Sequence, residues 1–132
     1  MKLDSIHLFQ LASARMQWLS ARQKVISENI ANADTPGYRA RDVTGFGQYV
    51  DRLETSGGAS AAAGGGDAGF GADAPVATAD APDTWGATLS GNTVVLEQQT
   101  VKAGETASQY RLAASLYRKA SDLLTLAATG KT

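Results

Sequence analysis

Apolar residues that recur at a step of seven, in one stretch near each end of the chain, most strongly constrain the fold. The first stretch covers residues 4–33 and contains no glycine or proline. Its apolar pairs at this step are Leu11 with Ala12, Trp18 with Leu19, and Val25 with Ile26. Such spacing is typical of a long helix that presents one apolar stripe to a partner.

A second helix is expected over residues 94–128, where two rows of residues also follow steps of seven. One row is Leu96, Ala103, Tyr110, Tyr117 and Leu124, and the other is Ala113, Ala120 and Ala127. Large side chains in one row and alanines in the other favour close helix packing, and we expect a wider face through Leu112, Leu116 and Leu123. Gly104 costs about 1 kcal/mol relative to alanine, so it is a weak point, and the sequence leaves open whether the helix divides or begins there.

The stretch between these helices has a different composition, because 18 of the 32 residues from 55 to 86 are alanine or glycine. Such a segment buries too little apolar area to offset the entropy lost on ordering, so we expect a flexible low-complexity insert over 55–86. A run within it, residues 64–69, matches the G-x-G-x-x-G dinucleotide pattern by chance only, since no strand and helix are expected around it.

The expected fold class is mainly α, with one domain built from residues 1–54 and 87–132. Its terminal helices pair as an antiparallel coiled-coil hairpin around the irregular Ala/Gly-rich middle. The expected seam consists of Leu11, Trp18, Leu19, Val25, Ile26, Tyr110, Ala113, Tyr117, Ala120 and Leu124. The pattern leaves two alternatives open, an autonomous hairpin or dimeric coiled coil and a subunit that completes its core only on polymerising.

The residue inventory argues against an enzyme, so we expect no catalytic residues, no metal site and no cofactor. Without cysteine the chain has no disulfide, thiolate metal site or thiol nucleophile. Its single histidine, His7, lies near a chain end and is a poor candidate for the base of a serine triad. A net charge of -1 argues against nucleic acid as a partner.

We expect neither a membrane-spanning segment nor a cleaved signal peptide. No apolar run approaches the roughly 20 residues of a membrane span. The first seven residues include Asp4 and other polar groups instead of the apolar run of a cleavable signal peptide. We therefore expect that any export from the cytoplasm uses another route.

The most specific local pattern follows the first helix. Pro36 and Gly37 suit the central positions of a type II turn, so the helix should stop by about Thr35. Asn29 and Asn32 can bond to backbone groups near the helix end, and Tyr38 can cover the turn. From these residues alone, the pattern predicts a well-made helix stop and no more.

The run Glu28-Asn29-Ile30-Ala31-Asn32-Ala33-Asp34-Thr35-Pro36-Gly37-Tyr38 resembles the signature of the bacterial flagellar rod and hook proteins. Residues 39–43, residues 91–94 and the closing helix from Gln109 resemble the proximal-rod branch of that family. The resemblance covers both flanks of the chain and not the middle. Two alternatives remain, another short rod subunit (FlgC-like) and a soluble coiled-coil adaptor or secretion chaperone.

The resemblance implies a structural subunit that polymerises through its terminal helices into the hollow drive shaft of the basal body and transmits torque. It implies export by the flagellar type III apparatus without a cleaved signal, and a place in the rod within the periplasmic space. The implied partners are further copies, the rod protein FlgC, the junction protein FliE and the membrane ring at the rod base. No small-molecule substrate is implied. The implied inter-subunit turn comprises Asn29, Asn32, Thr35, Pro36, Gly37 and Tyr38.

Overall fold

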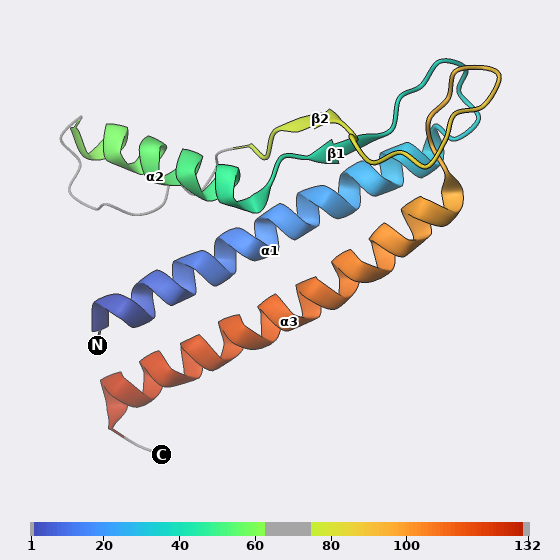
Figure 1. Cartoon of the computed structure of the whole chain (residues 1–132). Helices are drawn as coiled ribbons and strands as arrows, with labels where there is room; N and C mark the ends of the chain where they lie inside the picture. The colour runs from blue at the N-terminus through green and yellow to red at the C-terminus, as the bar shows by residue number, and fades with distance from the viewer. Residues whose placement is uncertain (1, 63–74, 131–132) are drawn as a thin grey trace.

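The computed structural model describes residues 2–62 and 75–130. Its elements are α1 (Lys2–Ala31), β1 (Arg41–Val43), α2 (Phe46–Ala62), β2 (Thr78–Asp80) and α3 (Leu96–Thr129). The two long helices α1 and α3 lie side by side, and the start of α1 lies at the same end as the close of α3 (Figure 1). The expected mainly helical architecture, with the terminal helices packed against each other, is confirmed.

Three contacts show how α1 and α3 pair. Asn29 bonds to Gln99 at 3.0 Å, and Arg15 bonds to Gln109 at 3.0 Å. Nearer the chain ends, the Phe9 ring has its centroid 4.3 Å from that of a tyrosine, Tyr117. Residue numbers rise along α3 as the numbers of their partners on α1 fall, so the two helices run antiparallel.

The helix α3 runs without interruption through Gly104, so the helix neither divides nor begins at this weak point. A glycine costs only about 1 kcal/mol in a helix, which the packing of turns on both sides offsets. The helix ends at Gly130, whose φ of 62° is left-handed and whose N–H bonds to the carbonyl oxygen of Leu126.

Parts of the alanine- and glycine-rich segment have regular secondary structure. Residues 55–62 continue α2, and β2 pairs antiparallel with β1 in the register Arg41 to Asp80 and Val43 to Thr78. The segment expected to be a flexible insert therefore carries regular structure at both edges, where residues 55–62 extend a helix and β2 pairs with β1. Residues 63–74, including the glycine-rich run 64–69, lie outside the described residues.

The main apolar cluster lies where α2 packs on α1, and it consists of Ala14, Trp18, Leu19, Tyr49, Leu53 and Ala113. The Trp18 Nε1 donates a hydrogen bond of 2.7 Å to the carbonyl oxygen of Thr44, which holds the link between β1 and α2 against α1. The Tyr49 hydroxyl similarly bonds to Gln17 at 3.0 Å. The helix α3 adds only a small side chain to this cluster.

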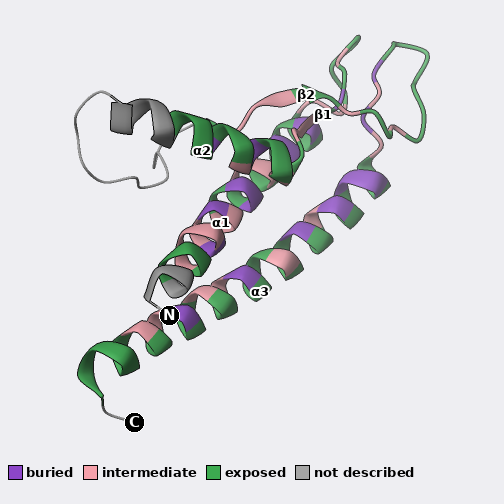
Figure 2. Ribbon diagram, turned by 60° about the vertical axis from the view of Figure 1, so that its left-hand side comes forward, coloured by how far each residue is buried: buried purple, intermediate pink, exposed green. Residues whose placement is uncertain are grey.

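The buried face of α3 contains part of the expected seam together with polar residues. The buried residues of this helix are Gln98, Gln99, Lys102, Thr106, Ala113 and Ala120, of which the two alanines belong to the expected seam. Figure 2 shows buried turns that recur along α3. The three leucines expected to widen this face, at positions 112, 116 and 123, are instead 63%, 47% and 58% exposed. Leu112 follows Val101 by eleven residues, which at roughly 100° per residue places both on the same outer side of the helix.

The expected seam residues range from buried to exposed. The buried ones are Trp18, Leu19, Val25, Ile26, Ala113 and Ala120. Leu11, Tyr117 and Leu124 are half-buried, whereas Tyr110 is 40% exposed. None of the helices in 2–62 and 75–130 combines the length and the apolar character needed to cross a bilayer.

Candidate functional site

The turn after α1 has the geometry that its sequence predicts. The helix ends at Ala31, and the Tyr38 N–H donates a 3.2 Å hydrogen bond to the carbonyl oxygen of Thr35. Gly37, at the third position of this turn, has φ of 72°. Proline followed by a residue with positive φ defines a type II turn, so that prediction is confirmed.

Asn29 is the polar centre beneath this turn and is 1% exposed. Its Oδ1 accepts hydrogen bonds from the Arg41 N–H at 3.0 Å and the Tyr38 hydroxyl at 3.3 Å. Its Nδ2 donates to the Arg41 carbonyl oxygen at 2.8 Å and to the Gln99 Oε1 at 3.0 Å. The residue thus joins α1, the chain entering β1 and α3, whereas the sequence predicts only bonds near the helix end.

Asn92 ties the opposite loop to the turn. Its Nδ2 donates to the carbonyl oxygens of Asn32 and Thr35, both at 2.8 Å, and its Oδ1 accepts from the Val94 N–H at 2.8 Å. The Gly37 N–H also bonds to the carbonyl oxygen of Ser90 at 2.8 Å. We call residues 29–41 together with 88–94 the junction, because this hydrogen bonding joins them into one unit.

Two glycines have a left-handed backbone within the junction. The φ angles are 72° at Gly37 and 80° at Gly91, which favour glycine. A Cβ built on Gly91 would lie 3.7 Å from the Cα of Gly37, so backbone conformation and not lack of space is the constraint at these positions. The outer surface of the turn, which includes Thr35, Pro36 and Gly37, is exposed.

A charged network lies beside the junction. The Asp42 carboxylate lies 3.3 Å from the Nε of Arg22 on α1 and 3.3 Å from the Nζ of Lys102 on α3. The same ammonium lies 2.9 Å from the Asp83 carboxylate, although only 9% of the Lys102 side chain is exposed. Sequence reasoning missed Lys102 and Asp83, because a single lysine on a helix ordinarily indicates a solvated face.

The hydrogen bond from Lys102 lowers the pKa of Asp83 below its usual value, and partial burial opposes that shift. The folded-state pKa is thus below the unfolded one, so the resulting stabilisation is present above a pH of roughly 4 and is lost as pH falls through the folded value. We expect the unfolding midpoint to fall less steeply for Asp83→Asn than for the wild-type chain as the pH is lowered from 6 to 2. Circular dichroism at a series of pH values measures this midpoint. An unchanged slope would contradict the coupling of Asp83 to Lys102.

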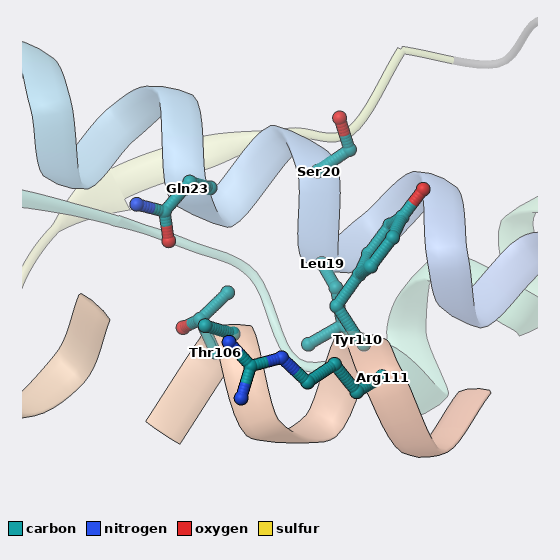
Figure 3. A pocket seen from close by; sticks show the side chains of 7 residues that line it. Leu19, Ser20, Gln23, Thr106, Tyr110 and Arg111 are labelled. Atoms are coloured by element: carbon teal, nitrogen blue, oxygen red, sulfur yellow. The ribbon is translucent and has the colours of Figure 1, made fainter. Parts of the chain in front are cut away.

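In the part of the chain that the structure describes, a groove is present and a metal-binding cluster is not. Among 2–62 and 75–130, no group of three or more histidine, cysteine, aspartate or glutamate side chains is arranged to hold a metal ion. An apolar groove does lie between α1 and α3, where Leu19, Tyr110 and Arg111 contribute to its lining (Figure 3).

A family model described as flagella basal body rod protein matches residues 9–39, which comprise most of α1 and the turn. The flagellar basal body rod protein FlgB of Agrobacterium fabrum is 36% identical over 118 residues, which are 88% of each chain. The chain belongs to the FlgB family. FlgB of Yersinia enterocolitica is 41% identical over 59 residues, 45% of this chain and 41% of that protein. FlgB of Escherichia coli K12 is 50% identical over 42 residues, 32% of this chain and 29% of that protein.

Membership in the FlgB family gives this chain a structural role in the flagellar rod, and the family is not one of enzymes. Its place in the cell is the flagellar basal body, among other components with which it assembles. The structure unites two segments whose sequences resemble the family, residues 28–38 and residues 91–94, within the junction. Within the junction, Asn29 links α1 to Gln99 on α3, and Asn92 links the loop before α3 to the carbonyl oxygen of Asn32 in the turn.

Proposed function

We propose that this FlgB-family chain is a subunit of the proximal rod, which polymerises through α1 and α3 into the hollow shaft that transmits torque. The observation that carries the proposal is that α3 buries polar side chains and exposes large apolar ones. Its face toward α1 buries Gln99, Lys102 and Thr106, whereas Leu112 and Leu123 are more than half exposed. Exposed apolar rows of this kind mark interaction surfaces.

The pairing of α1 with α3 supports a subunit that completes its core on assembly. Beyond Thr106, the buried residues of α3 are the alanines at 113 and 120, which bury little apolar area. Partners that cover the outer leucines would add the missing stabilisation by mass action. We propose that α1 and α3 of each subunit pair along the expected seam as a coiled coil, which packs with its neighbours in the rod.

The exposed outer side of the turn supports a second contact. Asn29 is buried beneath the turn, whereas Pro36 and Gly37 are exposed and open to a neighbour. We propose that this surface lies between subunits. A backbone held in place by Asn29 and Asn92 presents such a surface with little ordering cost on binding.

The proposed neighbours are further copies of the chain, the rod protein FlgC, the junction protein FliE and the membrane ring at the rod base. The proposed route is export through the flagellar type III apparatus without a cleaved signal, to the rod in the periplasmic space. A chain without cysteine suits passage in the unfolded state, since no disulfide can form on the way. The proposal includes no nucleic acid and no small-molecule substrate.

Deletion of the gene in its native bacterium tests the proposed function. We expect non-motile cells without complete basal bodies, and restoration by the wild-type gene. Pro36→Ala combined with Gly37→Val should restore motility poorly, because valine disfavours the φ of 72° that the turn requires. The control is Gly45→Ala, at a position with open space around it.

Motile deletion cells with intact basal bodies would overturn the rod assignment. Equal restoration by both variants would show that the turn is not needed for assembly. Size measurement of the purified chain distinguishes the adaptor alternative, since a stable, discrete dimer at all concentrations would favour an adaptor over a polymerising subunit.

A further inference from the structure

One side of α3 carries a row of large apolar side chains that are 39–63% exposed. The row consists of Val101, Leu112, Leu116, Leu123 and Leu126. At roughly 100° per residue, these five positions fall within about 80° of one another around the helix. We call this row the α3 ridge, and its four leucines between positions 112 and 126 indicate a surface for another helix.

A groove lies on a different side of the helix pair. It has a volume of about 350 Å³, and Leu19 and Ser20 of α1 line it opposite Tyr110 and Arg111 of α3 (Figure 3). A neighbouring hollow of about 700 Å³ shares Ser20 and Tyr110 and extends toward the chain ends as far as Tyr117. We call the two together the α1–α3 groove.

The ridge and the groove lie on opposite faces of α3. Tyr110 follows Val101 by nine residues, which at roughly 100° per residue places the two about 180° apart around the axis. One copy can therefore offer its ridge to one neighbour and its groove to another. Contacts between unlike surfaces do not close into a dimer and generate rings or open helical polymers.

The charges on the two surfaces are complementary over part of their length. The groove lining includes Lys24 and Arg111 and no acidic residue. On the ridge, Val101 lies one helical turn from Glu97 and one turn from Glu105, and both glutamates are exposed. The later part of the ridge carries a lysine at position 119, so the complementary charge belongs to its first half.

We propose that the α3 ridge of one copy of this chain seats in the α1–α3 groove of the next copy, joining subunits head to tail. The inference rests on the proposed function, because it names the contact through which a rod subunit would polymerise. The ridge leucines supply the apolar area, and Glu97 and Glu105 set the orientation against the basic groove.

Sedimentation velocity of the purified full chain over a range of concentrations tests the contact. We expect the wild-type chain to form a series of oligomers larger than dimers, less populated at high salt. Leu116→Glu on the ridge and Ser20→Trp in the groove should each weaken self-association by roughly tenfold or more. Leu8→Glu is the matched control, because Leu8 is 46% exposed and Leu116 is 47% exposed.

Mixing the two defective variants is the decisive measurement. The intact ridge of the Ser20→Trp chain should enter the intact groove of the Leu116→Glu chain and form a 1:1 complex that cannot grow. Far-UV circular dichroism with unchanged helical content will establish that each variant has folded.

Wild-type oligomers that neither variant weakens, an equal loss with Leu8→Glu, or a mixture without a 1:1 complex would overturn the ridge–groove contact and leave the rod assignment standing. A wild-type chain that stays monomeric at every concentration would overturn the contact as well. The rod assignment itself is decided separately, by the motility of the deletion strain.

Discussion

Replacing Asn29 by alanine is expected to lower the free energy of unfolding by about 3 kcal/mol. The side chain makes four hydrogen bonds of 2.8–3.3 Å while only 1% exposed. Alanine would leave the Arg41 peptide groups and the buried Gln99 amide without these partners. Each buried polar group that loses its partner costs about 1–3 kcal/mol, and entry of water would recover part of the sum.

Urea unfolding followed by far-UV circular dichroism measures this effect at low temperature. The control is Asn32→Ala, which removes an asparagine three residues along the same motif. The Asn32 side chain bonds to the Glu28 carbonyl oxygen and to Thr35 in exposed positions, so we expect a loss below about 1 kcal/mol. Equal losses for the two variants would show that Asn29 does not hold the junction together.

The second large effect is expected for Asp42→Ala, a loss of about 2 kcal/mol of unfolding free energy. Asp42 lies between Arg22 and Lys102, and only 17% of its side chain is exposed. Its removal leaves Arg22 without this carboxylate and leaves Lys102 with Asp83 alone. Uncompensated charge near the interior is costly because it has lost hydration without gaining a partner.

The matched control for Asp42→Ala is Asp80→Ala in the same two-stranded sheet. Asp80 lies 3.3 Å from Arg39, but the two side chains are 61% and 73% exposed. An exposed pair of this kind contributes little, so we expect a loss below about 0.5 kcal/mol. The same urea titrations compare the variants, and a control loss as large as that of Asp42→Ala would refute the role of the charged network.

Much of the local structure could be predicted from the sequence. The step of seven and the absence of glycine or proline in residues 4–33 predict α1, and the pair Pro36-Gly37 predicts the turn that ends it. These features depend on backbone propensities and on neighbours a few residues away. The same is true of the α3 end, where Gly130 supplies the left-handed residue that closes the helix.

The polar contacts of the junction could not be predicted in the same way. Gln99 is 70 residues from Asn29, and Lys102 is 60 residues from Asp42. For a glutamine or lysine on a helix, the sequence alone predicts a solvent-exposed side chain, because its distant partner is known only from the fold. The nearest available signal was the piece Gly91-Asn92-Thr93, which resembles the family but does not reveal what Asn92 binds.

The sequence by itself determined two long terminal helices, the turn between α1 and β1, and the resemblance to flagellar rod proteins. Only the tertiary structure decided how far the contact with α1 extends around α3. The sequence predicts a seam that contains the alanine row, and it also predicts that three leucines widen this seam. Ala113 and Ala120 are buried, and Gln99 bonds to Asn29 on α1, whereas Lys102 pairs with carboxylates outside that helix. The leucines are consequently left outside, on the surface that we propose a second copy covers.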